Sequence, residues 1–594
     1  MIQQITTRMV RFVFITTLFA IWPAAAQKEI KGTPTKIDPG KELDQVIAHP
    51  SGEQARSFEE VIDRAVNSER MLIRRLRDKT PVIETYGQEM KGDPELGSVP
   101  HNDFYFLGQL NMRDGVVDKS YLPPRTKLKA MSHTIAGLFT TQYYSRGFAG
   151  QLFIDVVDFD RAHYTFEYIR REFLGDVRCY VVDVAPREGA AKRRFKGRIW
   201  VEDRDYNIVR LQGQYQPSSD HEYVHFECWR VNSGGMWLPA YVYSQEEEYR
   251  TALVKTAAIR VQTRLWAFER AHDRTDEAFT NLTVDAPQGV KDDSDAAADY
   301  SPLQSYRMWE EEAAQNVIDR LVRAGLIAPP GEVDQVLETV LTNLIVSANI
   351  NLDFKVKARI LLTTPLESMT LNHTILLSRG LIDVLPDEAS LAAVLAHELA
   401  HVVLGHSMNT KFAFEDRLLF DDPGIVKQVQ VGRDRAEEAA ADEKAIEILK
   451  KSPYKDNLAK VGLFLRMLSE RSEEVPHLIK PLLGNRMSDK RDLRLAGLMD
   501  QAPELQLRDK DQISALPLGS HIRMDPWSDQ LHLIKTTATQ RYAARDKMPF
   551  QVAPFMLHLT REDDKPTNIA GPAAPSVETP AVAPAASSNP AEHP

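Results

Sequence analysis

The sequence predicts an α+β protein in two parts: a mainly antiparallel β domain, followed by a mainly helical domain that holds a small sheet. Between residues 143 and 268, short runs that mix apolar and polar residues are separated by turn signals such as Gly234-Gly235, a pattern typical of antiparallel strands. From residue 308 onward, apolar residues recur instead at helical spacing, with two short strand-like runs among them. The change of period indicates a change of domain.

The first 26 residues have the pattern of a cleaved secretory signal peptide. Two arginines precede the apolar run 12–22, which is followed by Pro-Ala-Ala-Ala at 23–26. An uncleaved anchor is the alternative, although the run is short for a membrane span. Cleavage would take the formal charge from −11 to −13, because the segment carries two arginines and no acidic residue. We therefore expect a periplasmic or secreted protein whose mature chain has no transmembrane span.

The composition is that of a globular protein and argues against nucleic-acid binding. Of the residues, 43% are hydrophobic and 26% charged, with a negative net charge, whereas nucleic-acid-binding domains present basic surfaces. The two cysteines, Cys179 and Cys228, both lie in strand-like runs. In an oxidising compartment they could form a disulfide, but their separation in space cannot be read from the sequence.

Composition and periodicity divide the chain into segments. Polar stretches rich in Pro or Asp favour a leader and a linker, and a tail poor in large apolar residues cannot bury enough surface to fold. The predicted segments are a signal peptide (1–26), a loose leader (27–55), a helix plus antiparallel β domain (56–270), a linker (271–302), the helical domain (303–500), a C-terminal extension (501–560) and a disordered tail (561–594).

The stretch 391–406, LAAVLAHELAHVVLGH, contains His397-Glu398-Leu-Ala-His401 within a helical pattern of apolar residues. Residues i and i+4 lie one above the other on a helix, so His397 and His401 present two imidazoles to one point with Glu398 beside them. This geometry predicts a bound zinc ion with a base next to it. A chance occurrence of the spacing on a buried helix is the alternative.

A third zinc ligand is expected further along the chain, because catalytic zinc takes three protein ligands and keeps one position for water. Residues 435–449 form a second helical pattern with small residues on one face, which would allow close approach to the first helix. On it, Glu438 and Asp442 are again i and i+4, suited to bind the metal and to support a ligand histidine. Glu443 and Glu447 have the same spacing, so spacing alone does not choose between the pairs.

The segment from about residue 331 to 500 resembles the HtpX and CAAX-prenyl-protease family of zinc metallopeptidases, and within it the soluble periplasmic BepA-like subgroup. The matching residues are SRGLIDVLPDEASLAAVLAHELAH (378–401) and EAAAD (438–442). The resemblance implies a gluzincin-type fold, one Zn²⁺ per chain and a polypeptide substrate, here unfolded or misassembled envelope proteins.

The resemblance also assigns roles to individual residues and favours Glu438 over the rival pair. It implies His397, His401 and Glu438 as zinc ligands, Glu398 as general base, and Asp442 as the support of the site. The implied reaction is peptide-bond hydrolysis by zinc-activated water.

Two segments depart from the family pattern. Relatives carry an Asn-Ala pair ahead of the strand at 374–378 and a His-Pro-Ser segment after the glutamate helix, whereas this chain reads ESMTLN (367–372) and LGNRMSD (483–489). The usual oxyanion-stabilising histidine is therefore not identifiable. Any positioned cation or donor can serve, and the candidates are Arg486, Arg491 and His477.

The run Thr374, Ile375, Leu376 and Leu377 is a candidate substrate-binding strand. Zinc peptidases commonly bind the substrate backbone by β-addition to an edge strand beside the metal helix. A continuous apolar run is equally consistent with a buried structural strand.

The upstream strands suggest an alternative function. Residues 143–268 weakly resemble the half-barrel of periplasmic lipoprotein carriers such as LolA, through GRIWVEDRDYNIVR (197–210) and GMWLP (235–239). Such a sheet can hold an acyl chain or an unfolded segment, although an apolar face is also simply a core. The alternative is a chaperone-like or client-binding protein whose zinc site is structural or inactive, with His406 or His373 as fourth ligand.

Overall fold

The computed structural model describes thirteen stretches of the chain, which are 54–94, 97–113, 116–122, 148–188, 194–215, 225–250, 256–269, 302–406, 424–429, 431–487, 494–506, 522–533 and 550–562. The predicted signal peptide, almost all of the leader, linker and tail, and Arg491 lie outside these residues.

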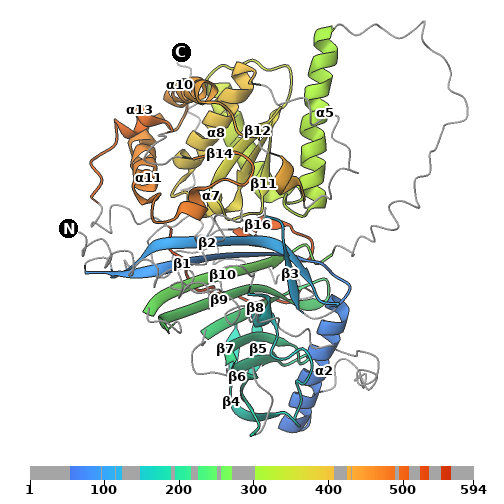
Figure 1. Cartoon of the computed structure of the whole chain (residues 1–594). Helices are drawn as coiled ribbons and strands as arrows, with labels where there is room; N and C mark the ends of the chain where they lie inside the picture. The colour runs from blue at the N-terminus through green and yellow to red at the C-terminus, as the bar shows by residue number, and fades with distance from the viewer. Residues whose placement is uncertain are drawn as a thin grey trace, which may run out of the picture.

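Ten strands in the described part of the chain form one large antiparallel sheet, in the order β3-β2-β1-β10-β9-β8-β7-β6-β5-β4 (Figure 1). Consecutive strands pair from β1 to β3 and from β4 to β10, and β10 pairs with β1, so that β3 and β4 lie at opposite edges. The strands are β1 (Val82–Asp93), β2 (Gly97–Asn111), β3 (Val117–Ser120), β4 (Tyr164–Leu174), β5 (Val177–Pro186), β6 (Phe195–Glu202), β7 (Ile208–Tyr215), β8 (His225–Ser233), β9 (Met236–Arg250) and β10 (Thr256–Trp266). The sheet thus begins well before residue 143, where the sequence pattern first indicated strands.

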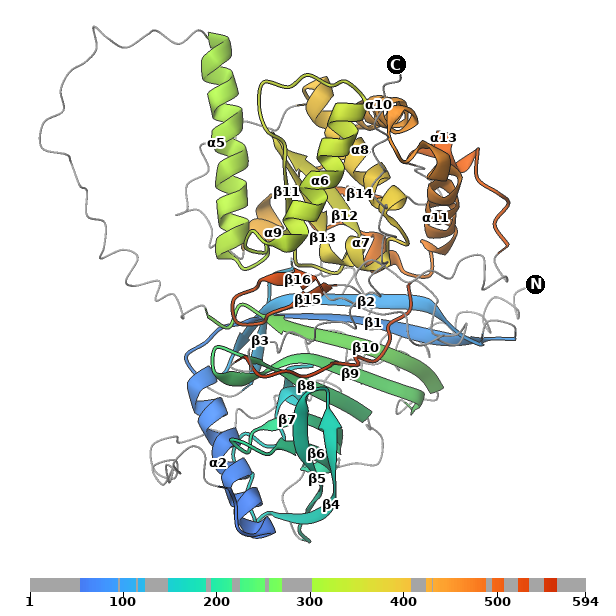
Figure 2. The ribbon, with the colours of Figure 1, turned by 180° about the vertical axis from the view of Figure 1, so that it is seen from behind.

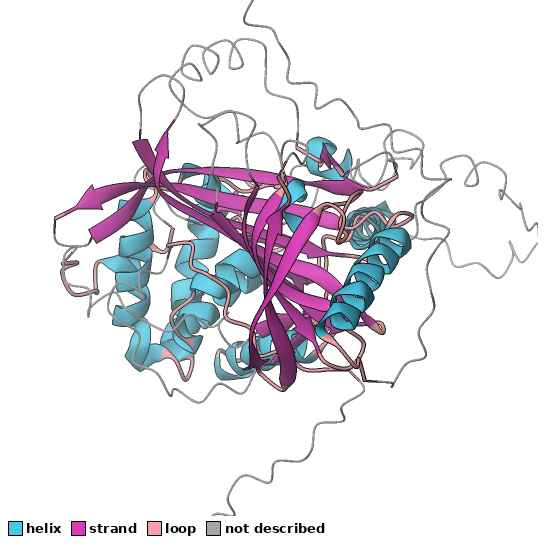
Figure 3. Cartoon of the chain, turned by 90° about the horizontal axis from the view of Figure 1, so that it is seen from below, coloured by secondary structure: helices cyan, strands magenta, loops and turns pink. Residues whose placement is uncertain are grey.

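One face of this sheet is covered by helix α2 (Phe58–Leu76), which lies against the strongly twisted strands (Figure 3). Ser57 caps the helix by accepting a hydrogen bond from the Glu60 amide. Its apolar stripe joins the core on that face, which also encloses a buried ion pair between Glu69 and Arg230. The helix predicted within the segment 56–270 is therefore present, and it covers a packed core.

The two cysteines are free thiols, so the disulfide considered from the sequence is not formed. Cys228 belongs to the core under α2, whereas Cys179 belongs to the core on the opposite face of the sheet. Because side chains of a strand alternate between faces, the sheet itself separates the two sulfur atoms.

The second domain is mainly helical around a small sheet, which confirms the predicted fold class. In its described residues, four strands are ordered β11-β13-β12-β14, with β11 and β13 parallel. Its elements are α5 (Pro302–Arg323), α6 (Glu332–Ser347), β11 (Lys357–Leu361), β12 (Glu367–Leu371), β13 (Thr374–Ser378), α7 (Arg379–Val384), α8 (Glu388–Leu404), α9 (Ile425–Gln428), α10 (Arg435–Lys451), α11 (Leu458–Arg471), α12 (Pro476–Ile479), β14 (Asn485–Arg486) and α13 (Ala496–Met499).

The strand β13 cannot take up a substrate strand, so the role predicted for Thr374, Ile375, Leu376 and Leu377 is wrong. On one side β13 pairs with β11, and on the other it pairs with β12. Its backbone amides and carbonyls are therefore engaged within the sheet, and β13 is the buried structural strand that was the alternative.

The two domains share one hydrophobic core and a set of buried polar contacts. Glu84 accepts hydrogen bonds from the Thr364 amide (2.6 Å) and hydroxyl (2.8 Å), ahead of β12. Asp103 accepts from the amides of His477 and Leu478, both at 2.8 Å, at the start of α12. The face formed by β1, β2 and β10 thus supports the helical domain directly, with a short hairpin of β15 (Ile522–Met524) and β16 (Leu531–Leu533) at the junction (Figure 2).

The last described residues, 550–562, run extended across the large sheet (Figure 2). Gln88 in β1 binds the backbone of Val552 at 2.9 Å, the Asp176 amide binds the Leu559 carbonyl at 2.9 Å, and Arg561 lies 2.8 Å from Glu202. Gly175 is required at this contact, since it has a φ of +69° and a Cβ there would lie 2.5 Å from the Leu559 nitrogen. This C-terminal strap, residues 550–562, therefore holds the sheet domain.

None of the described helices is both long and apolar enough to cross a lipid bilayer.

Candidate metal centre

Helix α8 carries the two histidines and the glutamate of the HELAH motif into the interior. Asp387 caps its first turn by accepting from the Ser390 amide at 2.8 Å, and Gly405 ends it in a left-handed conformation (φ 69°). His397, Glu398 and His401 are each at most 2% exposed. Such burial of three polar side chains on one helix requires partners for each of them.

Helix α10 supplies the partner of the two histidines. Asp434 caps it by accepting from two amides of its first turn. Ala441 and Ala445 are fully buried, which lets α10 pack closely beside α8. Glu438 and Asp442 consequently face the histidines.

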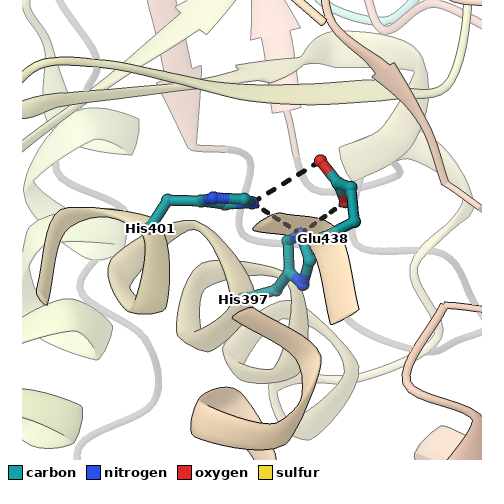
Figure 4. A group of neighbouring side chains, drawn as sticks. All are labelled: His397, His401 and Glu438. Carbon is teal, nitrogen blue, oxygen red and sulfur yellow. Dashed lines mark hydrogen bonds and ion pairs between the residues drawn. The ribbon is translucent and has the colours of Figure 1, made fainter. Parts of the chain in front are cut away.

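Three ligand atoms converge at this contact (Figure 4). His397 Nε2 lies 3.2 Å from Glu438 Oε2 and 3.2 Å from His401 Nε2, and His401 Nε2 lies 3.6 Å from Glu438 Oε1. Nitrogen ligands about 2.05 Å from a tetrahedral zinc are about 3.3 Å apart. The spacing and the donor set therefore fit one zinc ion.

The environment gives two of the three candidate ligands, His401 and Glu438, the charge that metal binding needs, whereas it favours the charged form of His397. Burial, followed by the nearby His397, lowers the pKa of His401 to about 2, so its imidazole is neutral. For Glu438, burial opposes ionisation, but the contacts with His397 and Arg494 outweigh it and lower the pKa to about 2. For His397, burial and Arg494 lower the pKa, yet its interactions with Asp442 and Glu438 leave it raised overall.

Asp442 contacts His397 at the Nδ1 side of its ring, away from Nε2. Its Oδ1 is 2.8 Å from His397 Nδ1, and its Oδ2 accepts a hydrogen bond from the Leu495 amide at 2.8 Å. A carboxylate in this place orients the ring so that Nε2 faces the metal position. The rival pair Glu443 and Glu447 is exposed, and Glu447 binds Lys444 and Lys451 instead.

Neither histidine considered as a fourth ligand reaches the cluster. The Nδ1 atom of His406 lies 2.8 Å from His401 Nδ1, on the side of that ring away from Nε2. His373 stacks on Phe354, with ring centroids 3.5 Å apart. Among the residues that the structure describes, the metal-ligating group therefore consists of His397, His401 and Glu438.

Neither of the two oxyanion candidates that the structure describes, His477 and Arg486, lies among the candidate metal ligands. His477 contacts Asp103 in the sheet domain, with Nδ1 at 2.9 Å from Oδ1. Arg486 is exposed on β14, and Arg491 lies outside the described residues.

Two residues that sequence reasoning missed enter the site from the chain after α12. The buried Arg494 has its guanidinium 2.8 Å from Glu438 Oε2 and 3.0 Å from His397 Nε2. Asn485 in β14 donates a hydrogen bond to Glu438 Oε1. Nothing in the charged run around Arg494 distinguishes it from its neighbours, so only the packing of this segment reveals it.

The hydroxyls of Ser368 and Thr370 in β12 were also missed. Both donate hydrogen bonds to the carboxylate of Glu398. The carboxylate of Glu398 is thus held by the sheet, while the three candidate ligands are held by the two helices.

Comparison with known proteins shows which family part of the chain is similar to. No curated protein matches the chain. Among the solved structures that match, two each cover 37% of this chain. One is a DUF1329 family protein from Desulfovibrio piger, with 10% identity, 96% of that chain covered and a TM-score of 0.20. The other is a putative outer membrane lipoprotein-sorting protein domain from Vibrio parahaemolyticus (12% identity, 97% of that chain, TM-score 0.19). Residues 337–420 match the model of peptidase family M48, which confirms the resemblance drawn from the HELAH segment, so this segment is similar to a family of metallopeptidases.

Proposed function

We propose that the protein is a zinc-dependent endopeptidase that hydrolyses peptide bonds with activated water and a glutamate general base. The observation that carries the proposal is the convergence of three ligand atoms, from His397, His401 and Glu438, next to the buried Glu398. Structural zinc sites are closed by four protein ligands, whereas catalytic sites keep one position for water and substrate. The set of three described here is of the catalytic kind.

Each residue has a role that follows from its contacts. His397 and His401 offer Nε2 lone pairs and Glu438 a carboxylate, while Asp442 holds the ring of His397. A zinc ion bound here supplies a water of lowered pKa and polarises the scissile carbonyl. Glu398 takes a proton from the attacking water and passes it to the leaving amine.

Arg494 is the cation that this site offers to the developing oxyanion. Its guanidinium lies 2.8 Å from Glu438 and is 7% exposed, so it is held in a largely dry environment. A fixed positive charge stabilises a developing negative charge more strongly there than in water. We propose it for this role in place of Arg486, which is exposed, and His477, which contacts Asp103.

The substrates we propose are unfolded or misassembled proteins of the bacterial cell envelope. The secretory pattern of the first 26 residues supports this location. The helical domain, residues 303–500, carries the chemistry.

The test uses purified residues 27–594 and an unfolded protein such as casein. We expect cleavage that a zinc chelator abolishes and that Glu398→Gln lacks, with the zinc content of that variant unchanged. Glu443→Gln is the matched control, because Glu443 is an exposed glutamate on α10 outside the ligand group. Activity in a metal-loaded Glu398→Gln protein, or zinc bound without any cleavage of unfolded protein, would contradict the proposal.

A further inference from the structure

We propose that Ser368 and Thr370 are positioning residues for the general base, which hold both carboxylate oxygens of Glu398 and fix the direction in which it faces the water. The inference rests on the peptidase function proposed above. It concerns residues that neither the HELAH motif nor the ligand set includes.

The contact is bidentate and buried. Ser368 Oγ donates to Glu398 Oε1 at 2.6 Å, and Thr370 Oγ1 donates to Oε2 at 2.7 Å. The exposed fractions are 1% for Ser368, 2% for Thr370 and 2% for Glu398. An ionised carboxylate only accepts hydrogen bonds, so two hydroxyl donors satisfy it without neutralising its charge.

The strand geometry explains why two hydroxyls reach one carboxylate. Side chains at i and i+2 of a strand point to the same side, so Ser368 and Thr370 both face α8, which packs against β12. Thr370 Oγ1 also lies 3.1 Å from the backbone carbonyl of Glu398, which places the strand beside that turn of the helix. One hydroxyl at either position would leave the carboxylate free to rotate about its last torsion.

The strand that carries the hydroxyls is itself held on both sides. It pairs with β13 through Ser368 and Thr370, and Arg433 donates to the Thr370 carbonyl at 3.2 Å. At its start, the carboxylate of Glu367 accepts from three successive amides ahead of β14, at 2.9 to 3.1 Å. The hydroxyls are thus fixed by the sheet rather than by the base that they hold.

A positioned base matters because proton transfer requires the carboxylate within hydrogen-bond reach of the water. A side chain that samples other rotamers spends less time in that geometry, which lowers kcat without altering how the substrate binds. Positioning therefore predicts a change in kcat alone, whereas loss of fold would change every measured property.

The experiment compares Ser368→Ala, Thr370→Val and the double variant with wild type. We expect kcat to fall on the order of ten- to a hundred-fold, with KM and zinc content unchanged. Thr370→Ser keeps the hydroxyl and should retain most of the activity. The matched control is Thr263→Val, which removes one hydroxyl of a buried pair with Thr85 (2.8 Å) in the sheet domain.

Two results would overturn the inference while the peptidase function stands. They are a double variant with the wild-type kcat, and a loss of kcat in Thr263→Val as large as in Thr370→Val. If the proposed peptidase function is wrong, the result is different: Glu398→Gln is then as active as wild type, or wild type is inactive.

Crystal structures of wild type and the double variant decide the matter even without activity. The expected result is a Glu398 carboxylate that is displaced or disordered in the variant. A carboxylate at the same place in both structures would show that the two hydroxyls do not position it.

Discussion

Replacing Asp442 with Asn tests how the ligand histidine is oriented. Asp442 uses both oxygens: Oδ1 lies 2.8 Å from His397 Nδ1, and Oδ2 accepts the Leu495 amide at 2.8 Å. An Asn side chain has one acceptor and one donor group. In Asp442→Asn, the amide NH₂ must therefore face either the Leu495 amide or the Nδ1–H of His397, and one of the two contacts is lost.

The expected loss of zinc affinity follows from the contact between Asp442 and His397. Loss of the partner of a metal-ligating histidine typically costs about 10- to 100-fold in metal affinity. That range corresponds to roughly 1.4 to 2.8 kcal/mol, which is the worth of about one hydrogen bond to a charged group. We expect the zinc dissociation constant of Asp442→Asn to rise by this factor, while the far-ultraviolet circular dichroism stays that of wild type.

The assay is competition for zinc against a chelator of known affinity at neutral pH. Glu447→Gln is the control, because Glu447 lies on the same helix, is exposed and forms ion pairs with Lys444 and Lys451. Equal affinities of Asp442→Asn and wild type would refute the role of Asp442. An equal loss in both variants would show that the effect comes from the helix rather than from the contact.

Two further predictions concern stability. Burial, against three backbone amides, raises the pKa of Glu367 to about 7 from 4.5, so the contribution of this carboxyl to the unfolding free energy should be greatest below pH 4.5 and fall by up to ~3 kcal/mol as the pH rises to about 7. Urea titrations across this range should show that fall reduced in Glu367→Gln, and identical pH dependence in both proteins would contradict it. Removing the carboxylate in Asp103→Ala leaves the buried Leu478 amide without its partner and should cost ~2–4 kcal/mol. A single thermal transition should shift to lower temperature, whereas two separate transitions with one unmoved would show that the domains unfold independently.

The parts of the site that lie on helices were predictable from the sequence, because helical spacing is local. His397 and His401 share a face whatever surrounds them, and the i, i+4 placement of Glu438 and Asp442 needed only a partner helix. The choice of Glu438 over the exposed Glu443 came from family resemblance rather than from spacing. The general fold class was likewise readable, since the periods of strands and helices differ.

The parts that depend on strand order were not predictable. The apolar run of β13 is compatible with an edge or an interior strand, and only its pairing with both β11 and β12 decides. Ser368 and Thr370 look like ordinary strand residues until α8 is packed on them. Arg494 reaches the ligands from a position 56 residues beyond Glu438, so no local pattern connects them.

The C-terminal strap has a consequence for how the protein is made. The contact between Gln88 and Val552 joins residues 464 positions apart, so the sheet is synthesised long before the segment that crosses it. Until that segment leaves the ribosome, the aromatic face around Trp229, Trp237 and Tyr241 lacks the cover that Phe555, Leu557 and Leu559 provide. A chain that stops short of residue 550 would expose this face, and exposed apolar sheet surface promotes aggregation. The sheet domain therefore reaches its final packing only after the strap, residues 550–562, has been synthesised.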